Sequence, residues 1–197
     1  KFEKLKLQFS HMQQVQSLGI RLCAPVEFGV CDEGVYTILQ WVDGRDAEGV
    51  LPTLDEKAQY AYGLEAGRML RTIHFLPSPV PTEPWSLRYD RKLDAKIAAY
   101  RACPIQYKNG ELYLELLKRE RHLVQNRPQV WLHGDYHCGN QMFNRQMELV
   151  VIDFDRDDSG DPWYEFNRII WDGRAAPEYA RGMVDGYFDG EKIPELF

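Results

Sequence analysis

The stretch that decides the fold is Leu-His-Gly-Asp-Tyr-His-Cys-Gly-Asn at residues 132–140, followed by Val-Ile-Asp-Phe-Asp at residues 151–155. A short apolar run leads into the first segment, and the residues between the two segments favour a β-hairpin. The loop therefore presents Asp135 and, five residues later, Asn140, while the second strand of the hairpin delivers Asp153.

Carboxylate and amide oxygens in this pattern suit a magnesium ion. Mg²⁺ binds few protein oxygens and shares its coordination shell with phosphate and water. Asn140 and Asp153 can supply two such oxygens, which leaves Asp135 to accept a proton from an attacking hydroxyl. Phosphoryl transfer needs this combination of a metal, an oriented nucleophile and reacting oxygens in line. The spacing thus predicts phosphoryl-transfer chemistry.

The motif His-Gly-Asp-x-His-x-x-Asn, with the later Ile-Asp-Phe-Asp and Gly-Asp-Pro, resembles the aminoglycoside phosphotransferase family of the protein-kinase-like superfamily. The resemblance implies an α+β protein-kinase-like fold. A truncated N-terminal lobe would carry a β-hairpin, and a mainly helical C-terminal lobe would carry the catalytic hairpin. By the same resemblance Asp135 is the catalytic base, and Asn140 and Asp153 are ligands of Mg²⁺.

The resemblance also implies supporting and nucleotide-binding residues. His133 would support the loop. From the residues themselves, we expect Asp155 to assist the metal and Asp161 to brace the loop and cap a helix that begins at Pro162. Residues 39–44 are similar to the hinge that meets adenine through main-chain hydrogen bonds. The residues expected to contact ATP are Gln40, Trp41, Val42 and Ile152.

Apolar periodicity predicts the elements around the motif. A helix face at residues 2–15 ends before Gly19, and a hairpin with strands at 26–30 and 35–42 follows. The spacing Thr53-x-x-Glu56 predicts a capping box that opens a helix reaching Leu76. The later predicted elements are helices at about 86–102, 110–126, 162–173 and 177–188, and strands at 130–132, 141–144 and 149–154.

The hinge divides the chain into two predicted domains. Residues 1–44 are a remnant of an N-terminal nucleotide-binding lobe with its hinge, and residues 45–197 are a catalytic and substrate lobe. The family's Gly-rich loop and strand-borne Lys cannot be placed in this sequence. Glu3 is a candidate for the partner of that Lys, although His11 lies nearer the expected position. We therefore expect this chain to be part of a longer kinase.

Composition limits the class of protein. The 197 residues carry 24 Lys and Arg against 30 Asp and Glu, a net charge of -6, which is unfavourable for a dedicated nucleic-acid-binding protein. No apolar run approaches the roughly 20 residues of a membrane helix, and the charged start lacks the apolar core of a signal peptide. Four cysteines without a Cys-x-x-Cys pair favour free thiols and a cytoplasmic location.

The leading functional hypothesis is an ATP- and Mg²⁺-dependent enzyme that moves the γ-phosphate of ATP to a hydroxyl of a small molecule. Residues 153–161 contain five Asp offset only by Arg156, and such a run attracts cations. This favours a cationic acceptor, and the family resemblance implies an aminoglycoside or another hydroxylated amine. Glu165 and Glu178 could add to the cation pocket, or could be plain surface acids.

Two alternatives stay open at this stage. The first is a catalytically silent, kinase-like binding protein, which the missing Lys strand favours and the intact Asp135, Asn140 and Asp153 oppose. The second is a metallohydrolase with zinc ligands among the His, Asp and Cys side chains of residues 133–138. That second alternative leaves the spacing of Asn140 and Asp153 unexplained.

Overall fold

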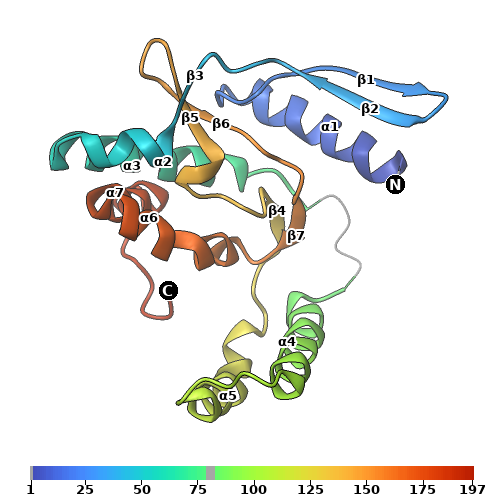
Figure 1. Ribbon diagram of the computed structural model, residues 1–197, viewed down its shortest axis with the longest axis vertical. Coiled ribbons are helices and arrows are strands. Elements are labelled where there is room, and N and C mark those ends of the chain that lie inside the picture. The colour runs from blue at the N-terminus through green and yellow to red at the C-terminus, as the bar shows by residue number, and fades with distance from the viewer. Residues whose placement is uncertain (1, 79–82) are drawn as a thin grey trace.

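The structure is a computed structural model that describes residues 2–78 and 83–197. Figure 1 shows its helices and short strands. The helices are α1 (Phe2–Ser17), α2 (Ala47–Val50), α3 (Glu56–Ile73), α4 (Trp85–Ala102), α5 (Gly110–Arg119), α6 (Ile169–Ala175) and α7 (Pro177–Phe188). The strands are β1 (Pro25–Cys31), β2 (Gly34–Leu39), β3 (Gly44–Asp46), β4 (Val130–Leu132), β5 (Gln141–Asn144), β6 (Leu149–Val151) and β7 (Asp158–Gly160). The 3₁₀ segments are η1 (Leu51–Thr53), η2 (Glu120–Val124), η3 (Cys138–Asn140) and η4 (Pro162–Arg168).

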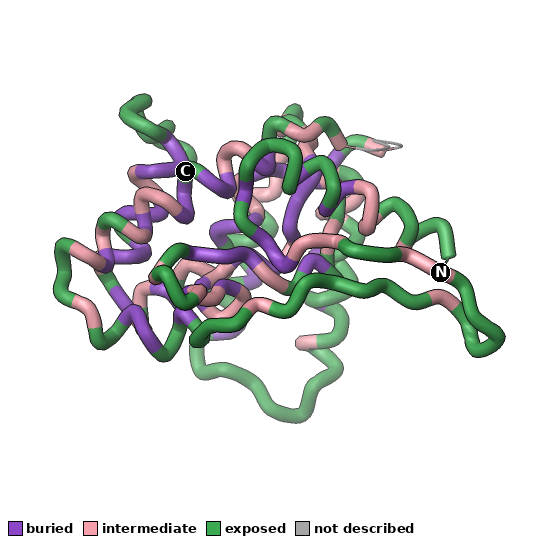
Figure 2. The backbone as a smooth tube through the Cα atoms, turned by 90° about the horizontal axis from the view of Figure 1, so that it is seen from above, coloured by how far each residue is buried: buried purple, intermediate pink, exposed green. Residues whose placement is uncertain are grey.

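The N-terminal part consists of α1 and the antiparallel hairpin of β1 and β2, which lie side by side in Figure 1. Phe28 of β1 packs against Phe2 and Phe9 of α1, with ring centroids 5.5 and 6.0 Å apart. Helix α1 also buries Met12 and Val15 in the main core. Neither strand of the hairpin contains a buried residue, and Figure 2 shows its outer end exposed.

A three-stranded antiparallel sheet of order β3-β5-β6 follows the hinge. A Cβ at Gly44 would overlap the main-chain oxygen of Phe143, so only glycine lets β3 approach β5 this closely. The chain before β1 is bonded to β6, because Val151 N donates to Arg21 O at 2.9 Å and Cys23 N donates to Val151 O at 3.1 Å. The N-terminal part is therefore tied directly to the strand that leads into Asp153.

Helices α3 and α7 form the helical core of the main body. Glycines lie along their contact: a Cβ on Gly63 or Gly67 would overlap main-chain oxygens of α7, and a Cβ on Gly186 would overlap the main chain at Leu64. The missing side chains let the two backbones approach closely. Helix α3 buries Ala66, Leu70 and Ile73 in the same core, to which α7 contributes Tyr179 and Met183.

Helices α4 and α5 form a separate helical pair, which lies below the main body in Figure 1. Leu93, Ile97 and Leu114 make a small hydrophobic cluster of their own between them. The pair contacts the main body through Trp85, whose ring lies 5.3 Å from that of Tyr164. Residues of α4 and of the main body together line a cavity between them.

Several predicted elements match the structure closely. The helices expected at 86–102 and 177–188 are α4 and α7, and the strands expected at 130–132 and 141–144 are β4 and β5. Asp161 caps η4, since its Oδ1 accepts the N–H of Trp163 at 3.0 Å. All four cysteines are free thiols, as the sequence predicted. In the parts of the chain that the structure describes, no helix is long and apolar enough to cross a membrane.

Other element predictions were wrong. Thr53 and Glu56 form no capping box, because Asp55 caps α3 by accepting the N–H of Ala58 at 2.8 Å, while Thr53 Oγ1 donates to Val50 O. The helix that was expected to stop at Gly173 continues to Ala175 and ends before a proline. Helix α3 ends at residue 73, strand β2 at 39 and strand β6 at 151, each earlier than predicted. Residues 110–126 divide into α5 and η2. The domain boundary after residue 44 stays a prediction.

Candidate active site

The 133–140 loop begins where β4 delivers His133 into the interior, with no exposed surface. Its Nδ1 accepts the N–H of Asp135 at 3.3 Å, and its Nε2 donates to the main-chain oxygen of Ile152 at 3.0 Å. Burial lowers the pKa of His133 to about 4, so the ring is neutral near pH 7 and carries its proton on Nε2. The imidazole thus joins the loop to the segment that precedes Asp153.

Gly134 turns the loop sharply, with φ at 86°. This left-handed conformation favours glycine. A Cβ here would also overlap the main-chain oxygen of Arg156. The loop and residue 156 are therefore in direct contact, which sequence spacing alone does not indicate.

Glu165 holds the main chain of the 133–140 loop by accepting two of its N–H groups. Its side chain is buried, its Oε1 accepts the N–H of Gly134 at 2.7 Å, and its Oε2 accepts the N–H of Tyr136 at 3.3 Å. Burial raises the pKa of this carboxyl to about 7. Glu165 is neither a surface acid nor part of a cation pocket, which corrects both sequence interpretations. The available signal was its place in η4, between the Asp161 cap and the apolar Phe166.

Asp172 of α6 holds the second half of the loop. It is fully buried, and its Oδ1 accepts the N–H of Cys138 at 2.7 Å. Burial raises the pKa of Asp172 to about 6, and burial together with this carboxylate raises the pKa of the Cys138 thiol. Asp172 was not predicted from the sequence, because no neighbouring residue indicates that this acid in α6 is buried.

The carboxylate of Asp135 contacts two arginines. Its carboxylate contacts Arg168 Nε, lies 3.2 Å from Arg156 Nη1 and lies 3.7 Å from His137 Nε2. The Arg168 contact is an ion pair whose atoms are not aligned as a hydrogen bond. Only 10% of the Asp135 side chain is exposed. The contact of Arg168 with Asp135 was not predicted from the sequence, and Arg156 was predicted only to offset the acidic run.

Asn140 and Asp153 come together through the main chain. Asn140 Nδ2 donates to Asp135 O at 2.9 Å, and Asn140 O accepts the N–H of Ile152 at 3.0 Å. Asp153 is exposed and has φ at 63°, a left-handed conformation that Asp adopts more readily than most residues. Asp153 thus follows directly after the residue that is bonded to Asn140.

The donors at this place fit a magnesium ion. An amide oxygen and an exposed carboxylate are oxygen ligands of the kind that Mg²⁺ accepts. Among residues 2–78 and 83–197 no group of three or more His, Cys, Asp or Glu side chains is arranged to hold a metal ion. Two protein ligands would therefore be completed by phosphate and water oxygens.

The acidic run after Asp153 is mostly engaged in other contacts. Asp157 Oδ2 accepts Trp131 Nε1–H at 3.2 Å and lies 3.4 Å from His11 Nδ1. Arg88 contacts both carboxylate oxygens of Asp158, at 3.1 and 3.2 Å. Arg127 likewise binds both oxygens of Asp161, at 2.7 and 2.8 Å. Asp155 remains exposed, and desolvation and then the nearby Asp153 carboxylate raise its pKa.

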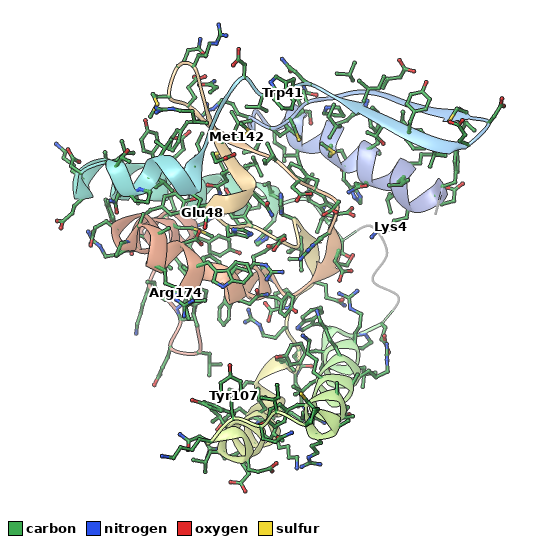
Figure 3. The ribbon with its side chains drawn as sticks, viewed as in Figure 1. Lys4, Trp41, Glu48, Tyr107, Met142 and Arg174 are labelled. Atoms are coloured by element: carbon green, nitrogen blue, oxygen red, sulfur yellow. The ribbon has the colours of Figure 1, made fainter. Side chains whose placement is uncertain are left out.

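The predicted hinge residues line a cavity of about 480 Å³. Gln40, Trp41 and Val42 contribute to it together with the turn between β5 and β6. Trp41 is 85% exposed, and Figure 3 shows it where the β1–β2 hairpin meets the rest of the chain. Ile152 does not line this cavity and is half-buried against the main core. The structure therefore brings together three of the four residues predicted to contact ATP.

The arrangement of these elements is that of the protein-kinase-like fold, as in solved aminoglycoside phosphotransferases. The chain belongs to the phosphotransferase enzyme family, whose model matches residues 2–196. This confirms the family resemblance and the α+β fold that the sequence predicted.

Solved structures of similar fold agree with this assignment. An aminoglycoside phosphotransferase from Alicyclobacillus acidocaldarius has a TM-score of 0.59 at 14% identity, over 100% of this chain and 67% of that one. The streptomycin-ATP-APH(2")-IIa ternary complex has a TM-score of 0.67 at 15% identity, over 96% and 67%. A choline/ethanolamine kinase family protein from Mesorhizobium loti has a TM-score of 0.63 at 14% identity, over 93% and 61%. No sequence among the curated proteins matches the chain.

Proposed function

We propose that this chain forms the catalytic part of an ATP- and Mg²⁺-dependent enzyme that phosphorylates a hydroxyl of a small molecule. The observation that carries the proposal is that Asn140 is hydrogen-bonded both to Asp135 and to the residue directly before Asp153. Asn140 binds the main chain of Asp135 and that of Ile152, next to Asp153. Membership in the phosphotransferase family supports the reaction class.

Asp135 is the proposed catalytic base. Its carboxylate takes the proton of the acceptor hydroxyl while the acceptor oxygen forms a bond to the γ-phosphorus. The bond from that phosphorus to the oxygen bridging to the β-phosphate breaks, and ADP leaves with the electron pair. Asn140 and Asp153 would hold Mg²⁺, which neutralises phosphate charge when bound.

The hinge cavity is the proposed adenine site. Gln40, Trp41 and Val42 line it, and ATP in one of the structures of similar fold supports ATP as the phosphate donor. We extend the proposal to Ile152 and to the supporting residues His133, Asp155 and Asp161. The four free cysteines support a cytoplasmic location, and the negative net charge supports a small-molecule partner rather than a nucleic acid.

One observation favours the catalytically silent alternative. Arg156 and Arg168 both contact the Asp135 carboxylate and so occupy the oxygens that would accept the proton. The zinc alternative finds less support. Both ring nitrogens of His133 are engaged with the main chain, and the raised pKa of Cys138 keeps its thiol protonated.

The deciding experiment is ³¹P NMR on the full-length protein with Mg-ATP and a pool of small hydroxyl compounds. An Asp135→Asn variant is compared with Asp32→Asn in the exposed hairpin turn. A phosphate-ester signal that Asp135→Asn loses and Asp32→Asn keeps is the expected result. ADP and free phosphate without ester indicate a working site with unsuitable acceptors. No consumption of ATP by the folded protein would favour the silent alternative.

A further inference from the structure

A second cavity, of about 510 Å³, lies between α4 and the 133–140 loop. In Figure 1, α4 lies below β4 and β7. The volume is within the range of sites for small molecules. The cavity is lined by Lys92, Lys96, Leu132, Gly134, Arg156, Asp158, Tyr164, Asn167 and Arg168.

The lining is strongly cationic. Lys92 and Lys96 lie one turn apart on α4, and Arg156 and Arg168 face them from the main body. Lys92 Nζ donates to Tyr164 OH at 2.6 Å, and neither lysine has a carboxylate within ion-pair distance among the described residues. The one carboxylate of the lining, Asp158, is already bound by Arg88.

This cavity adjoins the proposed base. Arg156 and Arg168 line it and also contact the carboxylate of Asp135. A group bound by these two guanidinium groups therefore lies beside Asp135. The arginine fork suits the planar or tetrahedral oxygens of carboxylate and phosphate, which it can bind in pairs.

Most of the acids that could have attracted a cation are engaged elsewhere, and the exposed Asp153 and Asp155 do not line this cavity. Asp157 and Asp161 are bound by Trp131 and Arg127, and Glu165 accepts main-chain hydrogen bonds. Glu178 contacts Arg181 on the surface of α7. A polyamine in the 510 Å³ cavity would instead meet two lysines, and two arginines that share the Asp135 carboxylate, which is unfavourable at short range.

We propose that the acceptor is a small hydroxyl compound that carries its own oxyanion, a carboxylate or a phosphate. This rests on the proposed function and departs from the cationic acceptor that the sequence favoured. Lys92, Lys96, Arg156 and Arg168 bind the oxyanion, and a neighbouring hydroxyl of the same molecule gives its proton to Asp135. The product carries both the original oxyanion and a new phosphate ester.

The test compares three acceptor sets with the full-length protein and Mg-ATP. Glyceric acid represents carboxylates, glycerol 2-phosphate represents phosphates, and streptomycin with ethanolamine represents amines. We expect ³¹P NMR to show ester with one or both oxyanion compounds and none with the amines. Ester formed with an amine alone would overturn the inference and leave the proposed function intact.

A variant that removes the charges of Lys92 and Lys96 tests whether these two residues bind the acceptor. Lys92→Gln/Lys96→Gln is compared with Lys108→Gln, which is exposed in the link between α4 and α5 and lies outside the cavity. We expect the double variant to raise the KM of the oxyanion acceptor about tenfold, with the KM of ATP unchanged. An unchanged acceptor KM would contradict the inference, and a rise in the KM of ATP alone would assign the lysines to the nucleotide.

Direct binding separates the inference from the proposed function. Saturation-transfer NMR without nucleotide detects glyceric acid and glycerol 2-phosphate bound to the wild-type protein and to the Lys108→Gln control. The signal should fall in Lys92→Gln/Lys96→Gln and with rising salt. If no compound is phosphorylated but this binding behaves as expected, the oxyanion site stands and the enzymatic proposal fails. Binding that is unaffected by the lysines would reject the site.

Discussion

The Nε2 of His133 lies 3.0 Å from the main-chain oxygen of Ile152. Through this hydrogen bond a buried, neutral imidazole connects the loop that carries Asp135 to the segment that carries Asp153. Since the same ring also accepts the N–H of Asp135, protonation of Nδ1 would remove one of its two hydrogen bonds. The arrangement of the proposed base and metal ligand therefore depends on the protonation state of His133.

The free energy of unfolding should fall in mild acid because of His133. Its pKa is about 4 in the fold and 6.5 when unperturbed, so the unfolded chain binds more protons between these values. The stabilisation is complete above pH 6.5 and is lost as the pH falls toward 4, by about 3 kcal/mol in total. Urea unfolding at pH 7, 5.5 and 4.5 measures this. A His133→Gln variant should show a flatter dependence, while His122→Gln, which is exposed, should keep the wild-type slope.

The contribution of Glu165 to the free energy of unfolding should have the opposite pH dependence. Its pKa is about 7 in the fold against 4.5 unperturbed, so its contribution is present below pH 4.5 and is lost as the pH rises through 7. Glu165→Gln should therefore lose less stability than wild type between pH 5 and 8 in urea unfolding. An equal loss in both proteins would show that the buried carboxyl is already ionised.

Removing the Glu165 carboxyl altogether should destabilise the fold. Glu165→Ala leaves the N–H groups of Gly134 and Tyr136 without their acceptors, which costs about 1–3 kcal/mol for each buried donor. Glu178→Ala removes only a surface ion pair with Arg181, worth less than about 1 kcal/mol. Chemical denaturation compares the two variants. Similar losses would mean that the loop does not depend on Glu165.

Asp135→Asn should lower kcat by about 10²–10⁴-fold, the usual contribution of a positioned proton acceptor. The substitution keeps the shape of the side chain and removes the charge that Arg156 and Arg168 contact. Circular dichroism verifies that the variant is folded, and a coupled ADP assay measures the rate. A kcat within a factor of two of wild type would remove Asp135 from the mechanism.

The close contact of α3 and α7 should make Gly67 sensitive to substitution. A Cβ there would overlap the Met183 oxygen, which forces the helices apart and costs about 1–3 kcal/mol. Gly49→Ala in α2 is the matched control, because a Cβ at that position meets nothing within 4 Å. Thermal unfolding should show a lower Tm for Gly67→Ala and a Tm equal to or above wild type for Gly49→Ala. A normal Tm for Gly67→Ala would show that the helices can adjust.

The element predictions succeeded where the signal was local. Asp161-Pro162 specifies the start of η4, and the periodicity at 177–188 specifies α7, because caps and apolar faces depend on residues within a few positions. The capping-box prediction failed at Thr53 because Asp55 offers a competing side-chain oxygen directly before the helix. Gly173 failed as a helix end because α6 continues until a proline follows.

By itself the sequence determined the family, the α+β fold and the 133–140 loop with Asp135 and Asn140, since these depend on residue types at short, constant spacing. Only the tertiary structure decided the charge around the loop. Asp158 is bound by Arg88, 70 positions away, and Asp135 meets Arg168. An acidic stretch of sequence thus borders a cationic cavity, because burial and pairing between distant residues, rather than composition, decide which charges face a ligand.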